Sequence, residues 1–335
     1  MSFSPMNRRG ALRTVAALGG GGLWGGAWAQ ADKAAWPARP VRLVVPYNAG
    51  GATDAVARVI AEVLSKRIAQ PVVVDNKGGA GGILGTDTVA KAQPDGHTLL
   101  LSLSTSMLIN QFLYTKLPYN PQKDLTLLSQ VATAPIVLAV NPSVPAGNMK
   151  ELLAYIKANR GKLSYGSWGA GSQAHLSGSY MSKAMDAEMT HVAYKGESPM
   201  LQDLVGGQLQ LCFASALSTK PFLDAGRLKA IGVTGRQRMT ILPQVPTIHE
   251  QGVQDDAYTI TGWVGMAGPA GMPAALVEQI AAHLREVAKD AKVQERMVGA
   301  GFQLVMGSPQ AFRESYQREM PVWKALVESA GAKLD

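Results

Sequence analysis

The chain has 335 residues, which is more than one compact hydrophobic core usually serves and therefore predicts two lobes. Its hydrophobic content of 47% and charged content of 17% are ordinary for a globular protein and exclude a largely disordered chain. The formal net charge is +8. The basic residues are scattered along the chain, which argues against nucleic-acid binding, whereas the net positive charge favours anionic ligands.

Residues 1–29 predict an export signal that is cleaved after Ala29 and directs the protein to the periplasm. Basic residues around Arg8-Arg9 precede an uncharged stretch rich in Ala and Gly, which is too short for a stable membrane anchor. The paired arginines resemble a twin-arginine signal, and the ordinary secretory route is the alternative. Loss of Arg8, Arg9 and Arg13 would lower the net charge from +8 to about +5.

Short apolar runs then alternate with helical patterns. Strands are predicted at 41–45, 71–75 and 99–101, and helices at 55–69 and 86–92. The order strand, helix, strand with short turns predicts an α/β fold with a parallel sheet covered by helices on both faces.

The same pattern recurs after a strand at 136–140, where we expect the chain to cross into a second lobe. Further strands are predicted at 163–167, 190–194, 209–213 and 228–233, and helices at 149–159 and 173–185. A strand at 261–267 returns to the first lobe and is followed by helices at 274–290 and from Ser308-Pro309 onward. The predicted domains are residues 30–134 with 262–335 as lobe 1 and residues 135–261 as lobe 2, with two connections as a hinge.

Glycine loops between strands and helices are the first candidate ligand sites. In Tyr47-Asn48-Ala49-Gly50-Gly51, the two glycines allow a sharp turn, and Thr53 and Asp54 begin a helix whose free N–H groups favour an anion. The loop Gly79-Ala80-Gly81-Gly82 departs from dinucleotide and phosphate motifs and favours a carboxylate-accepting nest. Alternatively, the first loop is a tight turn, and Asp54 is either a helix cap or a partner for a ligand hydroxyl or amine.

Three later groups complete the candidate site. Ser104 and Thr105 follow the third strand and offer hydroxyls, which are also ordinary helix caps. Ser167, Trp168, Gly169 and Ser172 mirror the first loop in the second lobe, where Trp168 is either an apolar wall or part of the core. In the turn Tyr194-Lys195-Gly196, Lys195 faces either the ligand or solvent.

Catalytic patterns are missing from the sequence. The five histidines, which are His97, His175, His191, His249 and His283, do not have the spacing of metal ligands. There is also no Gly-x-Ser-x-Gly nucleophile motif. The single cysteine, Cys212, stands in an apolar stretch that favours a buried position. We therefore predict a binding protein with no catalytic residues, no metal and no cofactor, and treat an exported hydrolase as the weaker alternative.

Several motifs in order resemble the Bug family, the TctC-like periplasmic substrate-binding receptors of tripartite tricarboxylate transporters. They are Gly50-Gly51-Ala52-Thr53-Asp54, Gly81-Gly82-Ile83-Leu84-Gly85, Pro94-Asp95-Gly96-His97-Thr98-Leu99, His191-Val192-Ala193-Tyr194-Lys195-Gly196 and Leu242-Pro243-Gln244-Val245-Pro246-Thr247. The resemblance covers nearly the whole chain after the signal. Tyr47 and Asn48 depart from the Phe and Pro that the family often carries there.

The resemblance implies a type II periplasmic-binding-protein fold, in which two α/β lobes joined by a two-connection hinge close over a ligand. It places one ligand carboxylate at Tyr47–Asp54 and Gly79–Gly82, and the other end of the ligand at Ser167–Ser172 and Tyr194–Gly196. The implied function is capture of a small organic acid, by a monomer, for uptake through membrane transporter subunits. The alternative is a ligand-binding subunit of a membrane sensor.

Overall fold

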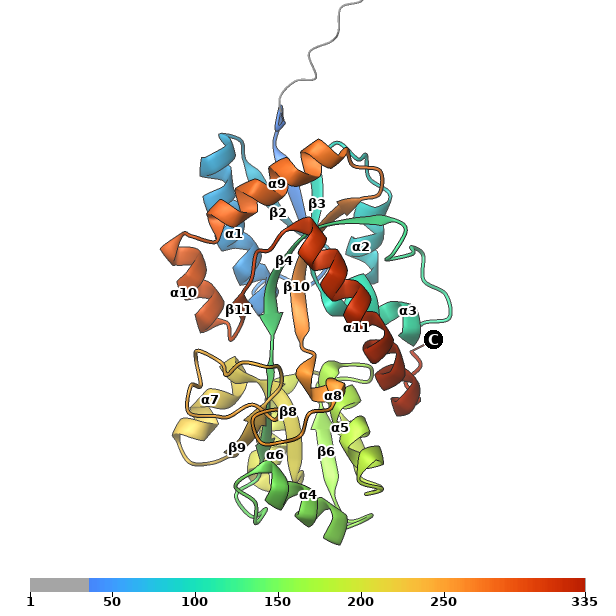
Figure 1. Ribbon diagram of the computed structural model, residues 1–335, viewed down its shortest axis with the longest axis vertical. Helices are drawn as coiled ribbons and strands as arrows, with labels where there is room; N and C mark the ends of the chain where they lie inside the picture. The colour runs from blue at the N-terminus through green and yellow to red at the C-terminus, as the bar shows by residue number, and fades with distance from the viewer. Residues whose placement is uncertain (1–35, 335) are drawn as a thin grey trace, which may run out of the picture. The chain divides into compact units, whose positions relative to one another are not determined.

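The computed structural model describes residues 36–334 (Figure 1). These residues belong to one compact unit. No helix within them combines the length and the apolar character that crossing a membrane requires. The predicted export signal, residues 1–29, lies outside the described residues.

The first sheet has six strands in the order β11-β4-β10-β3-β1-β2. Its strands are β1 (Val41–Val45), β2 (Val72–Asn76), β3 (Thr98–Leu103), β4 (Leu125–Ala134), β10 (Gly262–Pro269) and β11 (Gln303–Leu304). β1 is parallel to β2 and β3, whereas β10 is antiparallel to both β3 and β4. The predicted parallel arrangement of the first three strands is therefore confirmed. The whole sheet is mixed, because the chain returns from the second lobe through β10 and enters this sheet from the opposite end.

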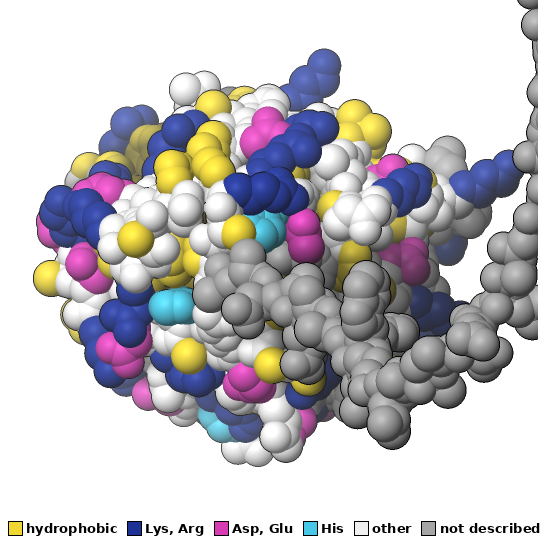
Figure 2. Space-filling view, turned by 90° about the horizontal axis from the view of Figure 1, so that it is seen from above, with side chains coloured by type: hydrophobic (Ala, Val, Ile, Leu, Met, Phe, Trp, Pro, Cys, Tyr) yellow, Lys and Arg dark blue, Asp and Glu magenta, His cyan; other side chains and the backbone are white. Residues whose placement is uncertain are grey.

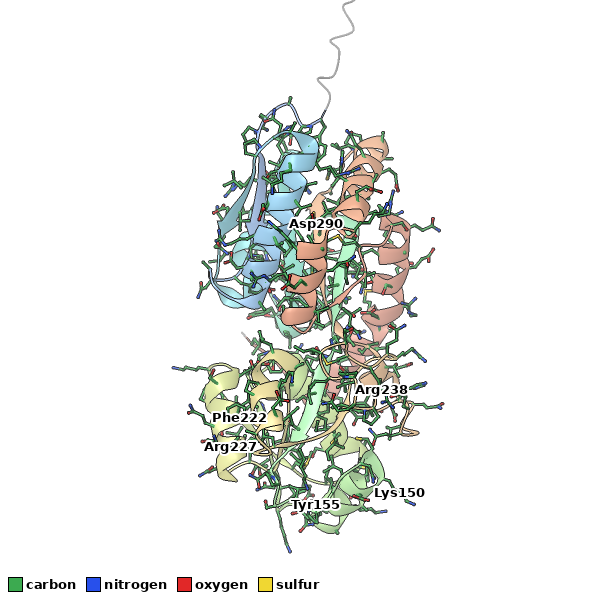
Figure 3. The ribbon with its side chains drawn as sticks, turned by 90° about the vertical axis from the view of Figure 1, so that its left-hand side faces the viewer. Lys150, Tyr155, Phe222, Arg227, Arg238 and Asp290 are labelled. Carbon is green, nitrogen blue, oxygen red and sulfur yellow. The ribbon has the colours of Figure 1, made fainter. Side chains whose placement is uncertain are left out.

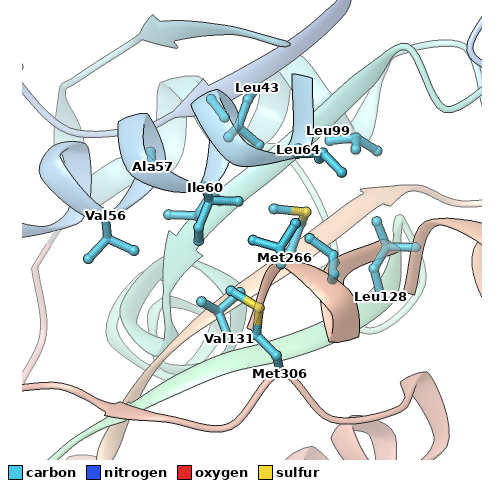
Figure 4. Close-up of a cluster of buried hydrophobic side chains, with 14 of the residues drawn as sticks. Leu43, Val56, Ala57, Ile60, Leu64, Leu99, Leu128, Val131, Met266 and Met306 are labelled. Carbon is cyan, nitrogen blue, oxygen red and sulfur yellow. The ribbon is translucent and has the colours of Figure 1, made fainter. Parts of the chain in front are cut away.

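Helices cover this sheet and bury its core. They are α1 (Ala52–Ile68), η1 (Ala80–Gly82), α2 (Ile83–Ala90), η2 (Thr105–Ile109), α3 (Asn110–Leu113), α9 (Ala274–Val287), α10 (Ala291–Gly299) and α11 (Pro309–Ala330). Val56, Ile60 and Leu64 recur every four residues on α1, so they share one face of the helix. Figure 4 shows this face against strand side chains that include Leu99 and Met266.

The second sheet has five strands in the order β7-β6-β8-β5-β9. Its strands are β5 (Ile136–Val140), β6 (Ser164–Ser167), β7 (Thr190–Ala193), β8 (Leu211–Ser215) and β9 (Lys229–Val233), and its helices are α4 (Met149–Ala158), α5 (Gln173–Ala184), α6 (Glu197–Gly206), α7 (Ala216–Asp224) and α8 (Asp256–Thr259). This sheet is also mixed, since β5 is antiparallel to β8 and β9. After α7, the Arg227 guanidinium lies 5.7 Å from the centre of the Phe222 ring (Figure 3).

The two sheets are connected through three regions. The chain passes from β4 to β5 at Pro135, and it returns through the segment between β9 and β10 (Figure 1). In addition, α11 packs on α5, where Leu176 shares an apolar cluster with Trp323 and Leu326. We use lobe 1 and lobe 2 for the predicted ranges, and their boundaries stay a prediction; α11, placed in lobe 1, contacts both.

Local pattern located most strands and the longer helices of the predicted set to within a few residues. The elements that were not predicted are β4, β11, α3, α6, α7, α8, α10, η1 and η2. β4 includes the buried polar residues Ser129 and Gln130, which interrupt the apolar run that marks a strand. The Ser129 hydroxyl donates to the Gly307 carbonyl, 3.0 Å away, a contact with a distant segment. Figure 2 shows basic and acidic side chains interspersed over the face that it displays, in agreement with the scattered charge of the sequence.

Candidate functional site

Asp54 anchors the loop between β1 and α1. One carboxylate oxygen accepts hydrogen bonds from Gly50 N–H at 2.8 Å and Arg58 Nε at 3.0 Å, and the other accepts from Asn76 Nδ2 at 3.0 Å. Burial raises the pKa of this carboxyl, but the hydrogen bonds outweigh burial and the pKa lies below its usual value. Both oxygens of Asp54 thus have protein partners, so this residue positions the loop.

The backbone of this loop requires glycine at one of its two glycine positions. Gly50 has φ +89°, a conformation that side chains with a Cβ rarely adopt. Gly51 has φ −77° and ψ 170°, which any residue can adopt, and a Cβ there would lie 3.8 Å from the Asn48 carbonyl oxygen. Of the two glycines that were expected to allow a sharp turn, only Gly50 therefore has backbone angles that favour glycine.

The two glycine loops of lobe 1 lie against each other. A Cβ at Gly78 would lie 2.4 Å from Asn48 Oδ1, and one at Gly82 would lie 3.2 Å from the Tyr47 hydroxyl oxygen. That hydroxyl is 3.2 Å from Ser102 Oγ, which is 2.6 Å from Ser106 Oγ. Burial raises the pKa of Tyr47. Close packing therefore holds the two loops together, and the chain of hydroxyls joins Tyr47 to β3 and η2.

In lobe 2, Ser167 is in hydrogen-bond contact with a histidine. Its Oγ lies 2.7 Å from His191 Nε2, and the His191 ring stacks on His175 with centroids 3.9 Å apart. Burial and, to a lesser degree, His175 lower the pKa of His191 to about 4. Ser167 is fully buried at the end of β6 and His191 is half-buried on β7, so this pair joins β6 to the edge strand β7.

Other predicted residues of lobe 2 also have protein partners. Ser172 Oγ accepts the His175 backbone N–H at 3.3 Å and caps α5. The Tyr194 hydroxyl donates to Asp203 Oδ2 at 2.6 Å, and Lys195 is exposed. Gly196 has φ +118° and directly precedes α6, so Glu197 is the first residue of that helix.

A cavity of about 390 Å³ lies between residues of the two lobes. Lobe 1 contributes Ala52, Thr53, Leu103, Ser104, Thr105, Ile109, Ala134, Gly262, Trp263, Ala300, Gly301 and Phe302. Lobe 2 contributes Pro135, Ile136, Trp168, Gln173, Glu197, Ser215, Leu217 and Ser218. This volume and the mixture of apolar walls with a few polar groups are typical of small-molecule sites.

The structure places four of the predicted residues on this cavity: Thr53, Ser104, Thr105 and Trp168. Residues 48–51 and 79–81 are exposed and do not line it. Tyr47, Asp54, Gly82, Ser167 and Ser172 pack within the lobes and do not line it either. Gly169, Tyr194, Lys195 and Gly196 also do not line it. Contact of any of these residues with a ligand stays a prediction.

The sequence interpretation missed most of the cavity wall. Glu197 directly follows the predicted turn at 194–196, so an acidic residue beside a glycine turn was the available signal. Ser215, at the end of β8, and the segment 300–302 are distant in sequence from every predicted loop and carried no signal of their own.

Comparison with known proteins identifies the family. The family model described as tripartite tricarboxylate transporter family receptor matches residues 56–332. The chain belongs to this receptor family. It is 33% identical to protein BugT of Bordetella pertussis over 300 residues, which are 89% of this chain and 91% of that protein.

Solved structures of similar proteins confirm the type of fold. The receptor is similar to the periplasmic binding protein BugD, with 35% identity and a TM-score of 0.71, over 89% of this chain and 100% of that one. It is also similar to R. palustris Rpa4515, solved with adipate, with 32% identity and a TM-score of 0.75, over 89% of this chain and 100% of that one. The predicted periplasmic-binding-protein fold with two α/β lobes is therefore confirmed, and the receptor is a solute-binding protein.

Proposed function

We propose that the receptor binds a small carboxylate in the cavity between its lobes and delivers it to the membrane subunits of a tripartite tricarboxylate-type transporter. The single observation that carries the ligand class is the lobe 1 wall. Ala52 and Thr53 belong to the first turn of α1, whose N–H groups lack partners within the helix and favour an anion. The hydroxyls of Ser104 and Thr105 add further donors beside them.

A similar protein of known structure supports this proposal. Rpa4515, which shares the fold, was solved with the dicarboxylate adipate.

We also propose that the protein acts in the periplasm after cleavage following Ala29, and the mass of the protein recovered from a periplasmic extract tests this. Ser167 and His191 pair with each other, and neither side chain lines the cavity. This supports a structural role for the pair and a receptor that is not catalytic.

Thermal unfolding in the presence of small carboxylates tests the ligand class. A carboxylate at one hundred times its Kd is expected to stabilise the folded receptor by about 2.7 kcal/mol, because it binds the folded state alone. The screen is run before and after unfolding, dialysis and refolding, so that a co-purified ligand does not mask binding. If no carboxylate raises the melting temperature of the refolded receptor, the proposal is wrong.

The substitution Thr53→Val locates the carboxylate. It keeps the shape of the side chain but removes its hydroxyl, so we expect carboxylate affinity to fall about fivefold to tenfold, the equivalent of one hydrogen bond. Thr88→Val on α2 is the matched control, since Thr88 does not line the cavity. Equal affinities of the two variants would contradict the placement.

A further inference from the structure

Glu197 brings a negative charge to the lobe 2 wall of the cavity. It is the first residue of α6 and the one charged side chain among the described residues that line the cavity. Lysine and arginine side chains are missing from that lining. The cavity therefore has an acidic side chain opposite a wall that suits a carboxylate.

The carboxylate of Glu197 is held in a defined orientation but is not neutralised. Ser215 N–H donates to Oε1 at 2.8 Å, and Ser215 Oγ donates to Oε2 at 2.5 Å. Ser215 is itself fixed as the cap of α7, where its Oγ accepts the Ser218 N–H. Within residues 36–334, Glu197 has no ion-pair partner, and each of its oxygens keeps a further acceptor position.

The charge of Glu197 determines which second group a bound carboxylate can carry. A second carboxylate on the ligand would approach Glu197 in a partly enclosed space, where repulsion is stronger than in water. An ammonium would instead form a charge-assisted hydrogen bond with it. Trp168, which also belongs to the lobe 2 wall of the cavity, has an aromatic face that attracts cations.

We infer that Glu197 selects amino carboxylates, which are small molecules with a carboxylate at one end and a protonated nitrogen at the other. The carboxylate would bind at Thr53 and Ser104 in lobe 1, and the ammonium at Glu197 and Trp168 in lobe 2. This inference rests on the proposed function and specifies its ligand class. It transfers to Glu197 the amine-binding role that the sequence left open for Asp54, whose two oxygens already have protein partners.

Calorimetric titration of the receptor, purified from the periplasm and freed of ligand by unfolding and refolding, tests the inference. The probes are straight-chain α,ω-amino acids and α,ω-dicarboxylates of matched length, from four to six carbons. We expect the amino acids to bind wild type at least tenfold more tightly, a difference of about 1.4 kcal/mol. If the dicarboxylates bind wild type as tightly as the amino acids, the inference is wrong.

Glu197→Gln assigns the preference to this side chain. The amide is similar in size and can accept from Ser215 N–H and donate to Ser215 Oγ, so α6 and α7 should keep their positions. We expect amino-acid affinity to fall at least tenfold, while dicarboxylate affinity rises. Glu62→Gln, on the exposed face of α1, is the control that should change neither. A variant that keeps the wild-type preference overturns the role of Glu197.

The outcomes separate this inference from the proposed function. A preference for dicarboxylates in wild type disproves the selectivity of Glu197 but leaves a carboxylate receptor. Absence of binding by every carboxylate in the thermal screen disproves the proposed function itself. The wild-type comparison needs no substitution, so it decides the matter even if Glu197→Gln does not fold.

Discussion

Asp54 and Glu197 are acidic residues that each lie in the first turn of a helix after a glycine turn, yet their surroundings differ. Asp54 is 3% exposed and receives hydrogen bonds from a strand, a loop and its own helix. Among the residues that the structure describes, only Ser215 donates hydrogen bonds to Glu197, which lines the cavity. The number of protein donors thus separates a residue that shapes the site from one that is available to a ligand.

Asp54→Asn should destabilise the loop and the start of α1. The amide nitrogen cannot accept from Gly50, Arg58 or Asn76, so at least one partly buried donor loses its hydrogen bond to residue 54, at a cost of about 1 kcal/mol in the free energy of unfolding. We also expect weaker carboxylate binding, because Thr53 lies next to the disturbed position. Urea unfolding and calorimetry measure the two effects, with Glu62→Gln on the same helix as the control. An unchanged unfolding free energy would contradict the anchoring role of Asp54.

At the scale of elements, α11 determines how the lobes are joined. Ser308 caps its start by accepting the Ala311 N–H at 3.1 Å, and Gly331 ends it at φ +61°. Trp323 and Leu326 on this helix pack with Leu176 on α5. Lys183 Nζ on α5 also donates to the Ser329 carbonyl near the end of α11. Because α11 contacts both lobes, it joins them in addition to the two chain connections of the hinge.

Leu326→Ala tests this support. Leu326 is 3% exposed, so removing its branched side chain should leave a cavity and lower the free energy of unfolding by about 2–4 kcal/mol. Val298→Ala on α10 is the control, because Val298 is 37% exposed and should change stability by less than about 0.5 kcal/mol. Urea denaturation gives both values. A loss below about 1 kcal/mol for Leu326→Ala would show that α11 packs loosely on lobe 2.

For the whole molecule, stability should depend on pH through the stacked histidines of lobe 2. Burial lowers the pKa of His175 and of His191, the latter to about 4, whereas an unfolded histidine titrates near 6.5. Below pH 6.5 the unfolded state therefore binds protons that the folded state does not, and folding stability falls as the pH falls toward 4. This dependence is opposite in sign to that of a histidine stabilised by an acidic partner.

The expected loss from His191 is about 1 kcal/mol between pH 7 and pH 5.5, a value reduced because the ring is partly exposed. His191→Gln, whose amide can still reach Ser167, should flatten this part of the profile. Unfolding free energies at a series of pH values measure it. A wild-type stability that is constant from pH 7 to pH 5, or a variant with the same slope as wild type, would contradict the assignment.

The sequence by itself determined most strands, several of the longer helices and the family of this protein. Apolar spacing marked β1, α1 and β5, and Ser308-Pro309 marked the start of α11, because periodicity and capping depend on neighbouring residues. The tertiary structure alone decided which side chains form the cavity. The cavity joins Glu197 and Ser215 of lobe 2 to the segment 300–302 of lobe 1, and their approach depends on the packing of two sheets and on the antiparallel return of β10. The orientation of Asp54 was decided in the same way, since its partner Asn76 ends a different strand.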